Sequence, residues 1–355
     1  MQSAVLTLLL SFAYSAPTSD LDPSTLTGEA LVNYVNSLDT SWTATTDNFA
    51  PGVNPDIYKT GGSLDIDDPP GNDTDIIEYP FKVLDSVPTT FDAREAWPNC
   101  ADVISTIRDQ AQCGCCWAIA VAGAISDRIC INMHKPVLVS TQDIMSCCRY
   151  CGYGCRGGWQ YKAWQFYKQY GVVSGGLYDS KEGCSPYPFP PCNHIYNTSL
   201  ESNREKMKFC GKPNVYSNTP KCTRTCEAGY TVPYASDKHF AYYYYKFTSR
   251  PMSYRVLSIM SEIYISGSVT ASFTFYDDLF YYKSGVYHHT SGRKIYGHCV
   301  RIIGWGTEGG VDYWLIANSF NTFWGDGGYF KMRRGTNECG IENLVIAGLP
   351  RLPGK

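Results

Sequence analysis

The chain has 355 residues, which is enough for one large domain or two half-domains with extra segments. Its formal net charge is −3, so no basic field indicates binding to nucleic acid. The 16 cysteines would be hard to keep inert in the cytosol, and they indicate a disulfide framework made in an oxidising compartment.

An apolar run at the N-terminus is typical of a secretory leader. Residues 5–12 are mostly apolar, and Ala13 and Ser15 are small residues at suitable cleavage spacing, although no Lys or Arg precedes the run. We therefore expect a signal peptide over residues 1–16. No later run approaches the roughly 20 apolar residues of a membrane span. Two glycosylation triplets, at Asn72 and Asn197, fit the secretory route.

The stretch before the first cysteine has a different character. Residues 17–86 contain no cysteine, are acidic in places and are rich in Pro and Gly. Within them, Leu31, Val35 and Leu38 fall on one face of a predicted helix. The composition indicates a propeptide, and a flexible linker is the alternative that it leaves open. The compact region begins near Phe91, and we assign residues 87–355 to the mature domain.

The mature domain divides into a helix-rich part, an irregular part and a strand-rich part. Helical spacing and Ala-rich composition predict three helices, at 116–130, 142–148 and 158–170. Residues 171–250 are punctuated by Pro, Gly and Cys and are predicted to be loops pinned by crosslinks. Short β-branched and aromatic runs then predict strands of a barrel-like sheet, at 286–287, 298–303, 313–317 and 328–332. The expected fold class is α+β.

Four residues could together carry nucleophilic chemistry. Cys116 begins a predicted helix, and a helix N-terminus or an adjacent imidazolium lowers the pKa of a thiol. His298 lies in a predicted strand, and Asn318 could hold its imidazole by an amide oxygen. Gln110 could donate to a developing oxyanion together with the backbone N–H of Cys116. Each residue alone is weak evidence, because a lone histidine is more often structural.

The local sequence strengthens this interpretation. Residues 110–117, Gln-Ala-Gln-Cys-Gly-Cys-Cys-Trp, resemble the nucleophile segment of papain-like cysteine peptidases. Gly297-His298 and Tyr313 to Ser319 resemble the histidine and asparagine segments of that family. The resemblance implies a helical part that begins with the Cys116 helix, a β-barrel part that carries His298 and Asn318, and an active-site cleft between them.

One subfamily matches best, over about residues 87–349. The segments 126–130, 147–151, 173–178, 190–192 and 237–239 resemble cathepsin B, which has an occluding-loop insertion, here near 184–226. Two adjacent histidines of that loop bind a substrate carboxylate in the subfamily. Here the pair is His194-Ile195, and Phe323 replaces an acidic residue that tethers the loop, although His194 could still pair with Asp109. The resemblance implies that endopeptidase activity is favoured over dipeptidyl carboxypeptidase activity, unless His194 alone suffices.

The same resemblance assigns substrate-binding residues. Glu342 matches the acid at the base of the S2 pocket, where it could pair with an Arg at substrate position P2. The other residues assigned to substrate binding are Gly157, Gly158, Trp159, Cys299 and Trp324. Phe320 replaces the Trp that usually covers the bond between the catalytic Asn and His.

The family pattern also implies six disulfides. They are Cys100–Cys130, Cys113–Cys155, Cys147–Cys222, Cys148–Cys151, Cys184–Cys226 and Cys192–Cys210. This leaves Cys115, Cys116, Cys299 and Cys339, and a crosslink between Cys115 and Cys299 is one hypothesis. A zinc site in the cluster from Cys147 to Cys155 is an alternative that spacing allows.

The resemblance further implies a secreted or lysosomal (endosomal) zymogen that works in an acidic setting. Its own propeptide would block the cleft until cut near residues 84–87. We expect protein and peptide substrates, a monomer, no cofactor, no metal and no nucleic acid, with cystatin-type inhibitors as plausible partners. The rival interpretations are a non-catalytic binding protein on the same fold and a purely structural, disulfide-stapled domain.

Overall fold

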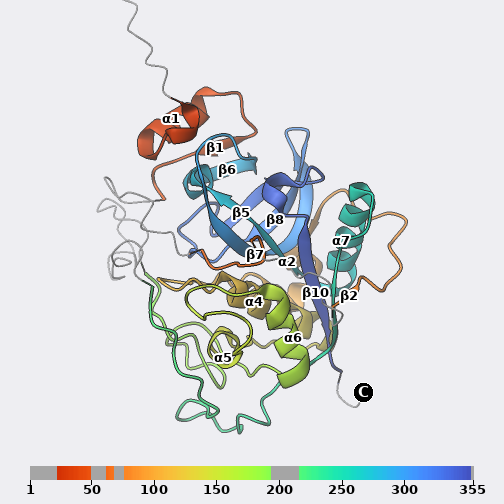
Figure 1. Ribbon diagram of the computed structural model, residues 1–355. Helices are drawn as coiled ribbons and strands as arrows, with labels where there is room; N and C mark the ends of the chain where they lie inside the picture. Colours follow the sequence, from red (N-terminus) through yellow and green to blue (C-terminus); the bar gives the residue numbers. More distant parts are fainter. Residues whose placement is uncertain (1–21, 49–60, 68–75, 193–215, 353–355) are drawn as a thin grey trace, which may run out of the picture.

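The computed structural model describes residues 22–48, 61–67, 76–192 and 216–352. The chain folds into a half built on helices and a half built on one large sheet (Figure 1). The predicted signal peptide, Asn72, Asn197, His194 and Cys210 lie outside the described residues.

The helical half is built around one buried helix. α4 (Cys116–Met133) is mostly apolar and buried on all sides, so it packs in the centre with neighbours around it. α5 (Thr141–Cys147) begins at Ser140, whose hydroxyl accepts the backbone N–H of Asp143 at 2.9 Å. α6 (Gln160–Tyr170) packs beside α4. Two short helices, α2 (Ala93–Ala96) and α3 (Ala101–Ile104), come before α4 in the chain.

The other half is a sheet in the order β1-β6-β9-β8-β7-β5-β10-β4-β2, with β3 pairing with β7. Strand β7 is central and runs antiparallel to β5 and β8, which places His298 opposite Phe273 and Cys299 opposite Ser272. The strands are β1 (Trp42–Ala44), β2 (Ile77–Glu78), β3 (Phe91–Asp92), β4 (Ala241–Lys246), β5 (Val269–Tyr276), β6 (Tyr282–Tyr287), β7 (Lys294–Glu308), β8 (Val311–Ala317), β9 (Tyr329–Arg333) and β10 (Leu344–Pro350).

Buried ion pairs join α4 to the elements around it. Arg128 donates to Glu262 of α7 (Met252–Ser266) at 2.8 Å, and both side chains are 1% exposed. Asp127 accepts from Arg301 of β7 at 2.6 Å. Since both acids and both bases are buried, each pair must stay intact for either charge to be tolerated.

The segment before the mature domain is packed on the sheet half. In α1 (Gly28–Ser37), Leu31 and Val35 are fully buried, and β1 adds to the sheet antiparallel to β6. Strand β2 pairs with β4 in the parallel sense. The described parts of 17–86 are therefore packed against the rest of the chain, which argues against a flexible linker.

The predicted helices and strands correspond to α4, α5, α6 and strands β6 to β9, with ends that differ by a few residues. The expectation of loops throughout 171–250 is wrong at β4, where a run of tyrosines forms a partly buried strand between β10 and β2. Helix α7 was not predicted, although Val256, Ile259 and Ile263 recur at helical spacing and are buried.

Five disulfides are present, and they are five of the six pairs that the resemblance implies. Cys192 is also disulfide-bonded, while Cys210 lies outside the described residues. The alternative of a zinc site at Cys147 to Cys155 is wrong, because all four cysteines of that cluster are in disulfides. The hypothesis of a Cys115–Cys299 crosslink is also wrong, since both thiols are free.

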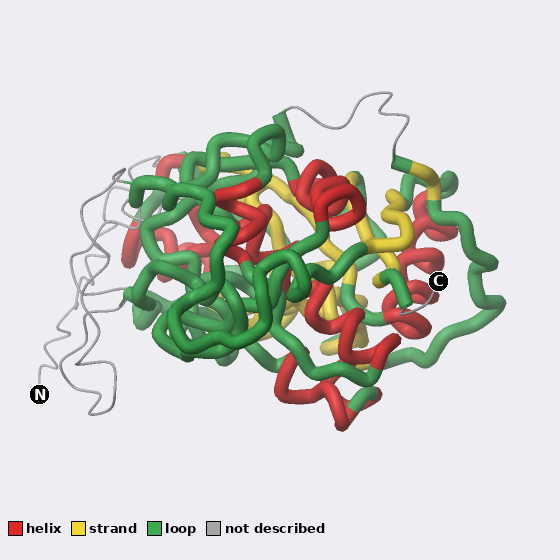
Figure 2. Tube along the Cα trace, turned by 90° about the horizontal axis from the view of Figure 1, so that it is seen from below, coloured by secondary structure: helices red, strands yellow, loops and turns green. Residues whose placement is uncertain are grey.

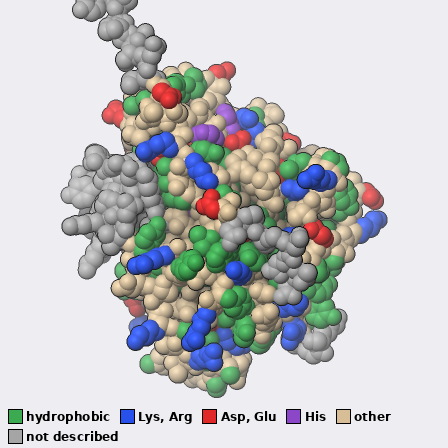
Figure 3. Space-filling view, in the orientation of Figure 1, with side chains coloured by type: hydrophobic (Ala, Val, Ile, Leu, Met, Phe, Trp, Pro, Cys, Tyr) green, Lys and Arg blue, Asp and Glu red, His purple; other side chains and the backbone are tan. Residues whose placement is uncertain are grey.

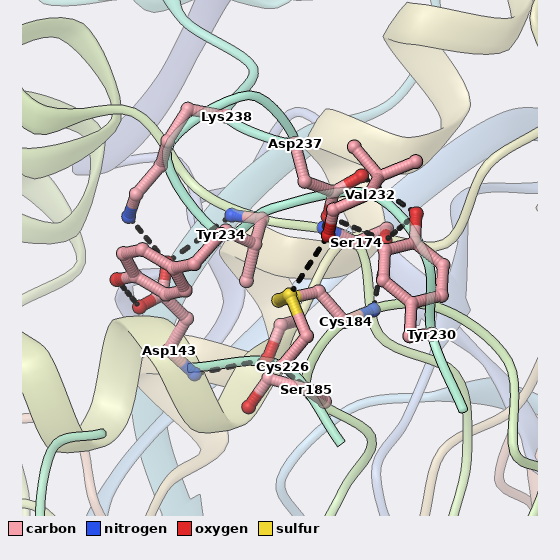
Figure 4. The surroundings of a disulfide bond; sticks show 12 residues. Asp143, Ser174, Cys184, Ser185, Cys226, Tyr230, Val232, Tyr234, Asp237 and Lys238 are labelled. Atoms are coloured by element: carbon pink, nitrogen blue, oxygen red, sulfur yellow. Dashed lines mark hydrogen bonds and ion pairs between the residues drawn. A yellow bond between two sulfur atoms is a disulfide. The ribbon is translucent and has the colours of Figure 1, made fainter. Parts of the chain in front are cut away.

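Hydrogen bonds around the Cys184–Cys226 disulfide join the segments on either side of the insertion to each other and to α5 (Figure 4). The carboxylate of Asp237 accepts the backbone N–H of Ser174 at 2.7 Å and the hydroxyl of Tyr230 at 2.7 Å. Lys238 donates to Asp143 of α5 at 2.8 Å. These polar contacts stabilise a loop-rich segment that has no apolar core of its own. Loops cover much of the molecule in the view of Figure 2.

Basic side chains are scattered over the face drawn in Figure 3. Within the described residues, α4 is the one helix that passes a test of length and hydropathy for crossing a membrane. It is 83% buried inside the protein, as expected of a core helix.

Candidate active site

Cys116 lies at the first position of α4, where its sulfur meets backbone donors. The thiol is fully buried, and the N–H groups of Cys299, Gly62 and Trp117 point at it. Cys299 directly follows His298 on β7, so the thiol meets the strand that carries the imidazole, at the junction of the two halves.

A hydrogen bond fixes the ring of His298. Its Nε2 lies 2.8 Å from Oδ1 of Asn318, which also accepts the N–H of Ser319 at 2.8 Å, so Nε2 carries the proton and donates it. Phe320 stacks on the imidazole with ring centroids 5.0 Å apart and covers this bond. The other nitrogen, Nδ1, has no hydrogen-bond partner among the described residues.

Gln110 is buried beside the start of α4. Its Nε2 donates to the carbonyl of Cys113 at 3.2 Å, and its Oε1 accepts the hydroxyl of Ser319 at 2.7 Å. These bonds tie the amide both to the turn before Cys116 and to the asparagine segment. Gln110 is thereby held near both halves of the site.

The neighbouring thiol of Cys115 points elsewhere. Its sulfur lies 3.1 Å from the hydroxyl of Tyr187, which donates to the carbonyl of Gln110 at 2.9 Å. Burial raises the pKa of Cys115 well above the ordinary range of a thiol. Cys115 is therefore a buried structural thiol, and Cys116 is the one that meets β7.

The segment 61–67 crosses this junction. The N–H of Gly158 donates to the carbonyl of Gly62 at 2.8 Å, and the N–H of Leu64 donates to the carbonyl of Gly158 at 3.0 Å. On the other side, the N–H of Ser63 donates to the carbonyl of Gly297 at 2.9 Å. Ser63 and Gly158 pair in the parallel sense. The segment is thus held by both halves at once.

Two glycines permit the crossing. A Cβ added to Gly62 would lie 2.0 Å from the carbonyl oxygen of Gly114, and one added to Gly61 would lie 2.0 Å from the ring of Tyr296. Only a residue without a side chain fits that close to the turn before Cys116. The pair Gly61-Gly62 is the sequence signal that could have located the crossing in advance.

Burial beneath this segment keeps both reactive groups uncharged. Burial raises the pKa of Cys116 to about 12, against the opposing effect of the three backbone donors. Burial also lowers the pKa of His298 to about 4, against the opposing effect of the Asn318 hydrogen bond. Both shifts oppose formation of a thiolate–imidazolium pair while the segment 61–67 lies over the site.

The residues assigned to substrate binding fall into two groups. Gly158 is hydrogen-bonded to the segment 61–67, and Cys299 interacts electrostatically with Asp65 of that segment. Gly157 and Trp159 lie on either side of Gly158, and the ammonium of Lys162 lies 3.8 Å from the Trp159 ring centroid. Trp324 is buried, donates to the carbonyl of Phe280 at 3.0 Å and packs edge-on against Phe320.

Glu342 is a correction to the sequence interpretation. It is fully buried, and its carboxylate accepts the indole N–H of Trp314 at 2.9 Å and the backbone N–H groups of Gly335 and Asn337 at 2.6 and 2.8 Å. Both of its oxygens are thus hydrogen-bonded within the sheet half, to β8 and to the turn at 335–337. Glu342 therefore holds that turn together and is not the base of a substrate pocket.

A different carboxylate lies beside the site and was missed by the sequence reasoning. Asp65, in the crossing segment, is 2% exposed and bonds Gln160 and Ser272 of the mature domain. An isolated aspartate in an acidic stretch carries no signal of this placement, because the partners come from α6 and β5.

Asp109 anchors the start of the predicted occluding loop. Its carboxylate accepts the backbone N–H of Ala111 at 2.7 Å, the backbone N–H of Cys192 at 3.2 Å and the amide of Asn321 at 3.2 Å. Asp109 and Phe323 line a hollow of about 350 Å³. Within the described ranges there is no group of three or more His, Cys, Asp or Glu side chains that could hold a metal ion.

Comparison with known proteins identifies the family. The sequence model described as "Papain family cysteine protease" matches residues 87–349. The chain belongs to this family. It is 41% identical over 358 residues to "Cathepsin B-like cysteine proteinase 5" of Caenorhabditis elegans, a match that covers 99% of this chain and 98% of the relative. It is 43% identical over 334 residues to "Cathepsin B-like cysteine proteinase 3" of the same organism, covering 91% and 83%.

Solved structures agree with the family. The chain is similar to "proCathepsin B S9 from Trypanosoma congolense", with a TM-score of 0.74, 32% identity and coverage of 93% of this chain and 100% of that chain. A digestive procathepsin L 3 of Tenebrio molitor, at 18% identity and a TM-score of 0.61, shares the fold. The predicted family, its cathepsin B-like character and the α+β papain-like fold are confirmed. The chain is a cysteine peptidase.

Proposed function

We propose that the chain is a zymogen whose processed form hydrolyses peptide bonds with Cys116 as nucleophile and His298 as its base. The observation that carries the proposal is the junction of α4 and β7. There the Cys116 thiol lies at a helix N-terminus beside the residue that follows His298, and Asn318 orients the imidazole.

In the proposed reaction, Nδ1 of His298 takes the thiol proton, and the Cys116 sulfur attacks the scissile carbonyl. The oxyanion receives hydrogen bonds from the Cys116 backbone N–H and from Gln110. His298 then gives the proton to the leaving amine, which leaves a thioester between the substrate acyl group and Cys116. Water, deprotonated by His298, attacks the thioester and releases the acid and the thiol.

The N-terminal segment supplies the control. We assign residues 17–86 to a propeptide, cut near residues 84–87, that inhibits the enzyme by occupying the junction. Three backbone hydrogen bonds hold Gly62, Ser63 and Leu64 there, and burial beneath them opposes ionisation of Cys116 and His298. The likeness to a procathepsin B over the whole of that solved chain supports this assignment.

We propose further that endopeptidase cleavage predominates, on protein and peptide substrates, in an acidic secreted or lysosomal setting. Ile195 replaces one of the two histidines with which the cathepsin B loop binds a substrate carboxylate. Asp109 is bonded to the backbone of Ala111 and Cys192 and to Asn321. His194 itself lies outside the described residues.

The test compares two substrates for the processed enzyme at pH 5. One is a blocked dipeptide ahead of a fluorophore, and the other is a free-carboxylate peptide that can lose a C-terminal dipeptide. We expect cleavage of the first, little cleavage of the second, and loss of both with Cys116→Ala. Absence of any cleavage by folded, processed enzyme would favour the non-catalytic alternative, and equal cleavage of both would show that His194 alone suffices.

A further inference from the structure

The propeptide places a carboxylate in a pocket of the mature domain. Oδ2 of Asp65 accepts the backbone N–H of Gln160 at 3.0 Å, the hydroxyl of Ser272 at 3.1 Å and that of Ser63 at 3.0 Å. Only Ser63 belongs to the propeptide. The other two donors remain when the propeptide leaves, and we call Gln160, Ser272 and Leu344 the carboxylate pocket.

The donors of this pocket are held in place by the mature domain itself. Nε2 of Gln160 donates to the hydroxyl of Ser272 at 2.7 Å and to the carbonyl of Leu344 at 3.2 Å. Gln160 is also the first residue of the 11-residue helix α6, whose N-terminus favours negative charge. Both bonds of the Gln160 amide join residues outside the propeptide, so the propeptide is not needed to hold these groups together.

Two buried oxygens in the pocket lack a donor. Oδ1 of Asp65 and Oε1 of Gln160 have no hydrogen-bond partner among the described residues. A buried acceptor without a donor costs about 1–3 kcal/mol. Only Oε1 of Gln160 stays when the propeptide leaves. A short side chain that carries both an acceptor and a donor, such as a protonated carboxyl or a carboxamide, would use the N–H of Gln160 and could also donate to this oxygen.

The pocket has no group that would pair with a cationic side chain. Glu342, the acid that the sequence suggested for this role, is buried and already hydrogen-bonded by Trp314, Gly335 and Asn337. Leu344, the pocket residue on β10, has an apolar side chain. A buried guanidinium without a carboxylate would be strongly disfavoured.

We infer that the carboxylate pocket makes the processed enzyme select substrates with a short acid or amide, Asp or Asn, at P2, and reject Arg there. This inference rests on the proposed function, because it assigns the position of Asp65 to the S2 side-chain pocket of the peptidase. In the precursor, Asp65 occupies the pocket as a substitute for such a substrate side chain.

The experiment measures kcat/KM at pH 5 for blocked dipeptides X-Arg ahead of a fluorophore, where X is Asp, Asn, Leu or Arg. We expect Asp and Asn to exceed Arg by at least about tenfold, since a site built to hydrogen-bond a side chain discriminates strongly against one that leaves its groups unpaired. Ser272→Ala removes one donor and Gln160→Pro removes the other at a helix position that accepts proline. Each should lower the Asp-to-Leu ratio about tenfold, whereas Thr274→Ala on the same strand, which does not bond Asp65, should leave it unchanged.

Binding by a cleavage-dead protein separates this inference from the proposed function. Cys116→Ala protein, processed by an added protease, is titrated with the same four peptides. Tighter binding of the Asp and Asn peptides than of the Arg peptide supports the pocket. If the active protein turns over none of the peptides but this binding order holds, only the proposed function is overturned. The inference would be overturned if turnover and binding favour the Arg peptide. It would also be overturned if neither Ser272→Ala nor Gln160→Pro changes the preference among the peptides.

Discussion

His298 is joined to Asn318 by a 2.8 Å hydrogen bond that lies beneath the ring of Phe320. The bond fixes which nitrogen of the imidazole carries the proton, because Oδ1 of Asn318 can only accept. The orientation of the base therefore depends on a side chain 20 residues away in sequence and on an aromatic ring that excludes water from the bond.

Loss of the Phe320 ring should weaken catalysis without abolishing it. An aromatic pair of this kind contributes about 0.5–1.5 kcal/mol, so Phe320→Ala should lower kcat/KM of the processed enzyme roughly threefold to tenfold. Phe320→Trp should keep or raise activity, since the larger ring covers the bond better. The pH profile of kcat/KM distinguishes this role from general destabilisation: Phe320→Ala should shift the limb that reports His298, and an unchanged profile would contradict the role.

A side chain at Gly62 should release the inhibited state. Gly62→Val cannot keep its distance from the carbonyl of Gly114, so the bonds of Gly62 and Leu64 with Gly158 should be lost. At about 1 kcal/mol each, their loss should weaken inhibition by the propeptide on the order of thirtyfold. The measurement is the activity of unprocessed precursor, with Glu29→Val, exposed on α1, as the control. A variant as inactive as the parent would show that the crossing does not depend on Gly62.

Thiol alkylation should report the burial of Cys116. Because burial raises its pKa to about 12 in the precursor, labelling by iodoacetamide at pH 7 should be on the order of a hundredfold slower there than in the processed enzyme. Peptide mass mapping identifies the labelled residue. An added model thiol of fixed concentration serves as the internal reference for the labelling rate. Equal labelling of Cys116 in both forms would contradict the proposed shielding.

Two buried groups should give the precursor opposing responses to acid. The pKa of His298 is lowered to about 4, so protonation disfavours the closed state as pH falls below about 6.5. The pKa of Asp65 is raised by burial from 3.8 to about 6. Protonation of Asp65 therefore stabilises the closed state, in which the propeptide occupies the junction; this stabilisation is complete below about pH 4 and is lost as pH rises to about 6. The titratable groups that interact with Asp65 are the thiols of Cys116 and Cys299.

Asp65→Asn should remove the response that opposes acid activation. Because Asn stays uncharged like protonated Asp65, the two precursors should have similar activity near pH 4, and the variant should be on the order of tenfold less active near pH 6, so that its activity rises more steeply as pH is lowered. The measurement is the initial rate against pH before any chain cleavage is detected. Parallel pH curves for the two precursors would count against titration of Asp65 in the pocket.

The ion pair between Arg128 and Glu262 should be essential for stability. Removing one partner of a buried pair costs about 3–5 kcal/mol, because the other charge is left without compensation. Glu262→Ala should therefore lower the melting temperature by several degrees with the disulfides intact. Glu308→Ala breaks an exposed pair with Lys331 and should have a small effect. Similar melting temperatures for the two variants would be inconsistent with the pair's burial.

The sequence predicted the parts of this protein that depend on local pattern and on family motifs. Helix α4 was predictable because Ala-rich apolar spacing runs unbroken from Cys116, and β7 was predictable from its β-branched run around His298. The family and fold followed from the motifs around Cys116, His298 and Asn318, and they are confirmed by the comparisons. α7 was missed although Val256, Ile259 and Ile263 carried a periodic signal.

Only the tertiary structure decided what fills the site and which carboxylate lies in it. Glu342 and Asp65 are both acids in ordinary-looking segments, and their roles depend on donors from distant strands and helices. Asp65 meets Gln160 and Ser272 because residues 61–67 cross between the two halves, a path fixed by backbone bonds to Gly158 and Gly297. A carboxylate's role is set by which donors surround it, and this depends on contacts between residues about 100 to 200 positions apart.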